Sequence, residues 1–224
     1  MRVLLFGASG MVGQGAIMAA LEDPVVTEVV SVVRRPTGRS HAKLVEVVHQ
    51  DLFDLAPIAN KLSGFDACFD CVGVSSVGLD EKEYTRQTYD LTMSIARAVH
   101  ARSPQAVFTY VTGVGTDSTE KGRSMWARVK GRTENAVLAL GFRAAYMFRP
   151  GFIQPERGIE SGTGWYRAFY VVARPLGGIL VKTMPGSATS TSAVGDAMRR
   201  TAACRAHPRG ARHQRAGGGP ARAT

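Results

Sequence analysis

The chain has 224 residues, of which 45% are hydrophobic and 8% aromatic, and its formal net charge is +10. This length allows one substantial core, so we expect one domain rather than two. No uninterrupted apolar stretch reaches about 18 residues, which excludes an obvious membrane span. Met1 and Arg2 lead directly into an apolar run without the anatomy of a signal peptide, and only three cysteines occur. These features favour a cytoplasmic protein.

The positive charge is concentrated at the end of the sequence. Residues 203–224 contain five arginines and no acidic residue, which is half of the net excess, among Ala, Gly, Pro and His. Such a composition cannot bury enough apolar surface to offset the entropy of ordering, so we expect a disordered basic tail. A nucleic-acid-binding arm is the weaker alternative, because no aromatic residue interleaves the arginines. Out-of-frame translation of GC-rich DNA is a further explanation of this composition.

Upstream of the tail, apolar runs alternate with segments of helical periodicity. The predicted strands cover residues 2–7, 28–33, 43–48, 65–73, 106–113 and 143–151, and the predicted helices cover 11–21, 52–62, 81–102 and 124–140. Each helix is followed closely by Gly or Pro. The alternation predicts the α/β class, as a Rossmann-type doubly wound parallel sheet with helices on both faces and a ligand beyond the carboxyl ends of the strands.

The segment GASGMVGQG follows the first predicted strand and opens the first helix. Gly7 permits a tight turn, Gly10 lets backbone N–H groups approach a diphosphate, and Gly13 allows close packing of helix on strand. The positive end of that helix would face the phosphates. The alternative is a merely flexible turn. The predicted nucleotide contacts in this segment are Gly7, Ala8, Ser9, Gly10, Met11, Val12 and Gly13.

Arg34 and Arg35 follow the second predicted strand, where a site for NAD places an acidic residue against the ribose hydroxyls. Two guanidinium groups can instead pair with a 2′-phosphate. The sequence therefore favours NADP(H) over NAD(H), although both arginines could also belong to a solvated loop.

Two further segments follow the third and fourth predicted strands. Asp51 could accept a hydrogen bond from an adenine amino group, and Leu52 would pack near the ring. The small residues Cys71, Val72 and Gly73 would lie under the adenosine ribose. Cys68 and Cys71 are interpreted as buried thiols rather than a redox pair.

Taken together, GASGMVGQG, the double arginine, YVTGVGTDS, WARVKGRTEN and FRPGFIQP, in this order, resemble the atypical branch of the short-chain dehydrogenase/reductase superfamily, close to epimerase-like and NmrA-like NAD(P)-binding proteins. The resemblance covers about residues 1–200. It implies a nicotinamide cofactor, a catalytic Ser-Tyr-Lys set, and backbone contacts from Pro150, Gly151, Phe152 and Ile153 to the carboxamide.

The catalytic set is incomplete. Lys130 matches the family lysine that holds the nicotinamide ribose, but Trp126 occupies the tyrosine position. The usual serine is also missing, and Thr112 offers a hydroxyl one residue away from its position. An indole N–H does not release its proton near neutral pH, so Trp126 cannot replace the acid. It either stacks on the nicotinamide or an aromatic substrate, or packs in the structure. Position in a predicted strand or in the long helix argues against Tyr84, Tyr89, Tyr110 and Tyr146 as alternative donors. Tyr166 and Tyr170, in the C-terminal segment, remain as possible donors.

We assign residues 1–202 to a single NAD(P)-binding domain, in which 151–202 form a substrate or lid segment. A short last helix from Ser192 to Met198 is expected there, and no metal site is predicted. Two functions fit these features: an NADPH-dependent oxidoreductase acting on a quinone-like or other small acceptor, or a non-catalytic NADP(H)-binding redox sensor. We expect a monomer or homodimer.

Overall fold

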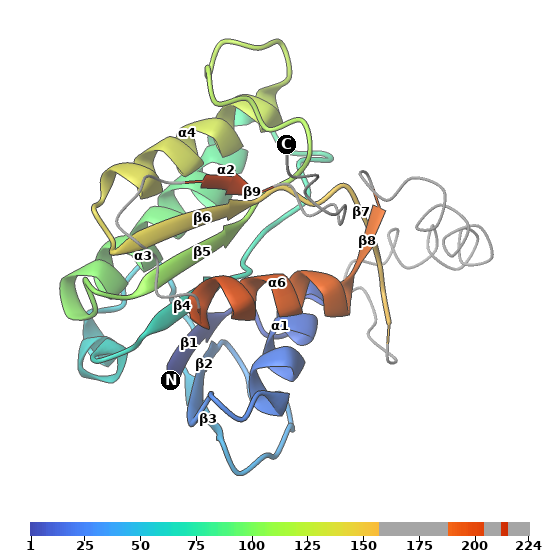
Figure 1. The fold of residues 1–224 in the computed structure, drawn as a ribbon. Helices are drawn as coiled ribbons and strands as arrows, with labels where there is room; N and C mark the ends of the chain where they lie inside the picture. Colours follow the sequence, from blue (N-terminus) through green and yellow to red (C-terminus); the bar gives the residue numbers. More distant parts are fainter. Residues whose placement is uncertain (157–187, 204–211, 215–224) are drawn as a thin grey trace.

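The computed structural model describes residues 1–156, 188–203 and 212–214 (Figure 1). A seven-stranded parallel sheet runs in the order β3-β2-β1-β4-β5-β6-β9. Its strands are β1 (Arg2–Phe6), β2 (Glu28–Val33), β3 (Leu44–Val48), β4 (Ala67–Asp70), β5 (Val107–Val111), β6 (Ala144–Phe148) and β9 (Arg212–Gln214). The order reverses between β1 and β4, which makes the doubly wound topology and confirms the predicted fold class.

Helices cover both faces of this sheet (Figure 1). One face packs on α3 (Leu91–Arg102), α4 (Met125–Ala139) and the 3₁₀ turn η1 (Ala56–Leu62), and the other on α1 (Met11–Glu22) and α6 (Thr191–Ala203). The central strand β1 is buried from Val3 to Phe6, with alternate residues in the two cores. This two-sided burial explains why its sequence is a continuous apolar run.

The structure differs from three sequence expectations. The helix expected over 52–62 is a 3₁₀ helix that begins only at Ala56. The helix expected over 81–102 consists of α2 (Glu81–Thr85), the π-helical turn η2 (Arg86–Asp90) and α3. Strand β4 ends at Asp70, so residues 71–73 form the following loop, and Cys71 is not on the strand.

The last described segments also differ from expectation. Strand β7 (Phe152–Gln154) pairs in parallel with β8 (Ala188–Ser190), and α6 then continues to Ala203 instead of ending at Met198. Residues 212–214, which we expected to be disordered, form β9 beside β6. The remainder of the expected tail, at 204–211 and 215–224, and the central part of the expected lid, at 157–187, lie outside the described residues. Within the described ranges, no helix is long and apolar enough to cross a membrane.

Candidate functional site

The glycine turn joins β1 to α1 and lies against the loop after β4. Gly7 has φ of +82°, and a Cβ added there would lie 2.7 Å from the Cys71 backbone. A Cβ at Gly13 would lie 2.0 Å from the Gly7 carbonyl oxygen. At the N-cap of α1, Gly10 has no side chain to cap the helix, and the nearest atom to an added Cβ is 3.3 Å away. Gly7 and Gly13 therefore permit close packing, while Gly10 leaves the helix start uncovered.

A cavity of about 1420 Å³ opens at the carboxyl ends of β1 to β4. Nine of the predicted nucleotide contacts line it, namely Gly7, Ala8, Ser9, Arg34, Arg35, Asp51, Leu52, Val72 and Gly73. Residues that sequence reasoning missed line it too, including Arg39, Phe53, Arg86 and Gln87. The cavity lies where a doubly wound fold binds its ligand.

The walls of this cavity are strongly basic. Four arginines line it, at positions 34, 35, 39 and 86, against a single carboxylate, Asp51. The Arg86 guanidinium lies 4.9 Å from the centre of the Phe53 ring, a cation–π contact between η2 and the loop after β3. This charge balance suits an anionic ligand.

The basic loop after β2 is anchored to the neighbouring strand. On β3, the Glu46 carboxylate accepts hydrogen bonds from the Thr37 N–H, at 3.1 Å, and from the Thr37 hydroxyl. The loop therefore has a defined conformation between Arg35 and Arg39. Across the cavity, Asp51 accepts the Phe53 N–H at 2.9 Å, which orients its carboxylate.

A second group of predicted residues surrounds the ends of β5 and β6 and lies outside the lining of that cavity. The half-buried Lys130 on α4 has its Nζ 6.0 Å from the centre of the Tyr110 ring. Removal from water lowers the pKa of Lys130 to about 8, although the charges of Glu134 and Asp70 oppose this shift. Lys130 is therefore a titratable cation near neutral pH.

Asp70 is an unexpected buried acid beside this lysine. It pairs in register with Tyr110 across β4 and β5, and its carboxyl group has no solvent exposure. One carboxyl oxygen accepts the Val72 N–H at 3.0 Å, and the other has no hydrogen-bond partner. Burial raises the pKa of Asp70 to about 7, against the opposing effects of that hydrogen bond and of Lys130.

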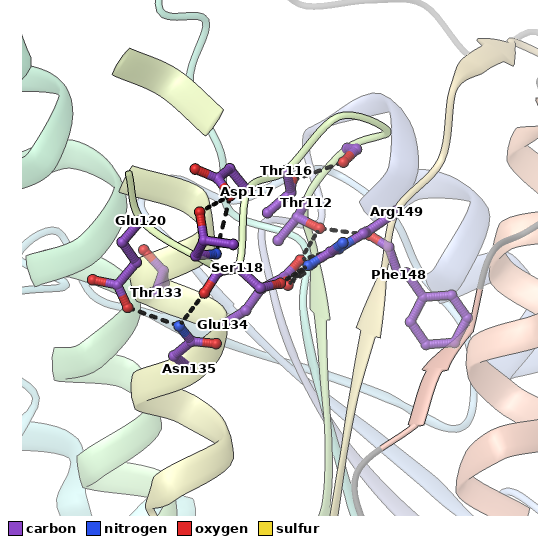
Figure 2. Close-up of polar contacts among 12 residues, drawn as sticks. Thr112, Thr116, Asp117, Ser118, Glu120, Thr133, Glu134, Asn135, Phe148 and Arg149 are labelled. Atoms are coloured by element: carbon purple, nitrogen blue, oxygen red, sulfur yellow. Dashed lines mark hydrogen bonds and ion pairs between the residues drawn. The ribbon is translucent and has the colours of Figure 1, made fainter. Parts of the chain in front are cut away.

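Thr112, the candidate that replaces the family serine, is part of a buried polar cluster (Figure 2). Its hydroxyl donates to Glu134 at 2.6 Å and approaches the Phe148 carbonyl oxygen at 3.2 Å. Glu134, which has no solvent exposure, also accepts from Nε of Arg149 at 2.9 Å and pairs with Nη2. The Thr112 hydroxyl is therefore directed into this buried cluster rather than toward an open site.

Trp126 lies at the start of α4, and its indole packs on the loop after β5. A Cβ added at Gly115 would be 3.3 Å from Cη2 of this ring. The alternative proton donors are poorly placed: Tyr84 and Tyr110 are 1% exposed, and burial raises the pKa of Tyr110. Tyr89 lies under the Arg132 guanidinium, at 4.3 Å. Tyr146 is half-buried in β6, and Tyr166 and Tyr170 lie outside the described residues.

The remaining predicted contacts do not line the cavity. Met11, Val12 and Gly13 form the first turn of α1, and the Cys71 backbone packs on Gly7. The Pro150 carbonyl oxygen accepts the Val114 N–H at 2.9 Å, and Gly151 leads into Phe152 and Ile153 of β7. Glu134 had a usable sequence signal, because it follows Lys130 by one helical turn. Arg86 had none, because its place in the wall depends on the π-helical turn.

Comparison with known proteins agrees with this geometry. A family model described as NAD(P)H-binding matches residues 7–141. The mitochondrial protein fmp52 of Emericella nidulans is 30% identical over 162 residues, covering 69% of this chain and 68% of the relative. The Saccharomyces cerevisiae protein FMP52, also named mitochondrial, is 26% identical over 170 residues, covering 74% and 71%. These names overturn the predicted cytoplasmic location.

Solved structures share the fold. Bordetella bronchiseptica WbmH, determined with NAD⁺, superposes with a TM-score of 0.65 at 17% identity, covering 95% of this chain and 74% of that one. The UDP-N-acetylglucosamine 4-epimerase of Methanobrevibacter ruminantium gives a TM-score of 0.67 at 14% identity, covering 92% and 74%.

Proposed function

We propose that this chain, which belongs to the NAD(P)H-binding family, is an NADPH-dependent oxidoreductase of the atypical short-chain dehydrogenase/reductase type. The observation that carries the cofactor assignment is the cavity at the strand ends, with its four arginines and single carboxylate. A dinucleotide with an additional 2′-phosphate matches this excess of positive charge better than one without it.

The residues present fit such a cofactor. The uncovered start of α1 at Gly10 would receive the diphosphate, since backbone N–H groups and the helix dipole both favour an anion there. Arg34 and Arg35 would bind the 2′-phosphate, and Asp51 would accept the adenine amino group. Lys130 and the Pro150–Ile153 backbone would hold the nicotinamide ribose and carboxamide.

The reaction must suit a site that lacks the family's acid. A nicotinamide cofactor would supply a hydride, and a ketone that accepted it would become an alkoxide that needs a proton at once. A quinone becomes a stabilised phenolate-like anion instead. Trp126 in the tyrosine position and the hydrogen-bonded Thr112 hydroxyl therefore favour a quinone-like acceptor over a simple ketone.

The enzymatic proposal is tested by following NADPH absorbance with panels of quinones and of ketones. We expect turnover with quinones that Lys130→Ala reduces by about 10²-fold, the scale of a lost positioning contact. The exposed Lys121→Ala serves as the control. Turnover of ketones alone, or activity that does not depend on Lys130, would contradict the assignment.

The second candidate is a non-catalytic NADP(H)-binding redox sensor of the NmrA-like kind. The observation that favours it is the commitment of Thr112 to Glu134, with an indole where the acid should be. Tight NADPH binding without oxidation by any acceptor would support the sensor over the enzyme.

A further inference from the structure

We propose that Glu134 and Arg149 are positioning residues that set the affinity for the nicotinamide half of the cofactor. They would do so by fixing helix α4, which carries Lys130, to the Pro150–Ile153 backbone. The proposal rests on the function proposed above, because that function assigns the nicotinamide half to these two segments.

The Glu134–Arg149 ion pair connects α4 with the segment after β6. Glu134 lies one helical turn after Lys130 on the same face of α4, and its charge acts on the lysine. Arg149 immediately precedes Pro150, and its Nε donates to both carboxylate oxygens of Glu134, at 2.9 and 3.1 Å. One ion pair therefore joins the two segments that would contact the nicotinamide ribose and carboxamide.

The same pair also fixes the strand ends and the intervening loop (Figure 2). Thr112, directly after β5, donates to Glu134, and its N–H donates to the Phe148 carbonyl oxygen at 2.7 Å. Arg149 donates to the Ser118 hydroxyl in the loop that leads to α4. Three segments thus meet at the Glu134 carboxylate, and the loop at Ser118 is joined to them through Arg149.

The burial of this ion pair limits what it can contribute to stability. Glu134 has no solvent exposure and the Arg149 side chain is only 19% exposed, so both charges are largely desolvated. A buried ion pair often gives no more stability than apolar side chains of equal volume. The planar guanidinium also restricts geometry, because its N–H groups donate to a carboxylate in only a few relative orientations. The Glu134–Arg149 pair is therefore better suited to fixing the position of α4 relative to the Pro150–Ile153 backbone than to stabilising the core.

The experiment separates the two halves of the cofactor. Calorimetry would measure the dissociation constants of NADPH and of 2′,5′-ADP for wild type, Glu134→Gln and Arg149→Lys. The second ligand contains adenosine with its 2′- and 5′-phosphates but no nicotinamide half. Both variants keep hydrogen-bonding capacity, and thermal melts would confirm that they are folded. Glu81→Gln is the matched control, because Glu81 of α2 forms an ion pair at 2.7 Å with Arg128 of α4, the helix that also carries Glu134.

We expect Glu134→Gln to weaken NADPH by about tenfold through misplacement of the nicotinamide contacts. Binding of 2′,5′-ADP should stay within about twofold, and Arg149→Lys should fall between wild type and Glu134→Gln because it retains the charge but not the planar fork. Equal weakening of both ligands, or of neither, would overturn the inference. If folded wild type binds neither ligand, the proposed function itself fails, and the inference fails with it.

Discussion

At the scale of single residues, the site combines groups that the family pattern predicts with one that it does not. Asp70 is buried beside Lys130 with one unpartnered carboxyl oxygen, in a strand that is otherwise apolar. The neutral form of a carboxyl is favoured in such surroundings. Between pH 3.8 and about 7, the folded state therefore keeps a proton on Asp70 that the unfolded chain has released.

This difference makes stability depend on pH. Because the pKa of Asp70 rises from 3.8 to about 7 on folding, its stabilising contribution is complete below about 3.8 and is lost as the pH rises toward 7. We expect Asp70→Asn, which keeps an acceptor for the Val72 N–H, to increase the free energy of unfolding at pH 8 by on the order of 3 kcal/mol. Urea unfolding of wild type and variant at pH 5 and pH 8 checks this. A constant difference between them at both pH values, or the same effect from the exposed Asp90→Asn, would contradict it.

The glycine turn gives a second prediction for single residues. Gly13→Ala places a methyl group against the Gly7 carbonyl oxygen, whereas an added Cβ at Gly73 has nothing within 4 Å. We expect Gly13→Ala to cost about 1–3 kcal/mol of stability through overpacking, and Gly73→Ala to cost little. Thermal melts compare the two variants, and equal melting temperatures would show that the close packing at Gly13 is absent.

At the scale of elements, the apolar pattern of the sequence predicts the strands but not the irregular part of the helices. The six apolar runs that predicted strands correspond to β1 to β6. Burial on both faces explains the continuous apolar residues of β1, β2, β4 and β5, whereas β3 at the sheet edge is only partly buried. The π-helical turn at Arg86–Asp90 was not predicted, because the apolar pattern over residues 81–102 was interpreted as one regular helix. The position of Arg86 in the cavity wall was therefore not predicted either.

The same limit applies to the candidate site. The glycine turn and the double arginine could be found because their chemistry is contiguous in sequence. The Glu134–Arg149 pair could not, because it joins residues 15 positions apart through the folding of α4 onto β6. Short-range patterns contain little information about such tertiary contacts.

The crossing of α1 and α6 gives a prediction at this scale. An added Cβ at Gly195 of α6 would lie 2.5 Å from the Gly15 carbonyl oxygen of α1. We expect Gly195→Ala to separate the helices and lower stability by about 1–3 kcal/mol. Ala193→Ser, an exposed change in the same helix, should leave the melting temperature unchanged. An unaltered melting temperature for Gly195→Ala would mean that this close crossing does not form.

At the scale of the whole molecule, the two halves of the sheet would have separate tasks. Strands β1 to β4 surround the basic cavity, and the ends of β5 and β6 carry the cluster around Glu134. In the proposed function, this division would place nucleotide recognition and nicotinamide positioning on different strands. Substitutions in one half should therefore leave the binding energy of the other half largely intact.

The glycine turn and the arginines after β2 are the centre of the proposed cofactor site, and calorimetric titration with NADPH and NADH tests both directly. We expect wild type to prefer NADPH, and Arg34→Ala combined with Arg35→Ala to weaken NADPH by about 10- to 100-fold while NADH changes little, the scale of lost charge-assisted hydrogen bonds. Arg97→Ala combined with Arg102→Ala removes the same charge from an exposed part of α3 and should have no effect. Equal losses for both nucleotides, or no binding heat with either on folded protein, would contradict the account.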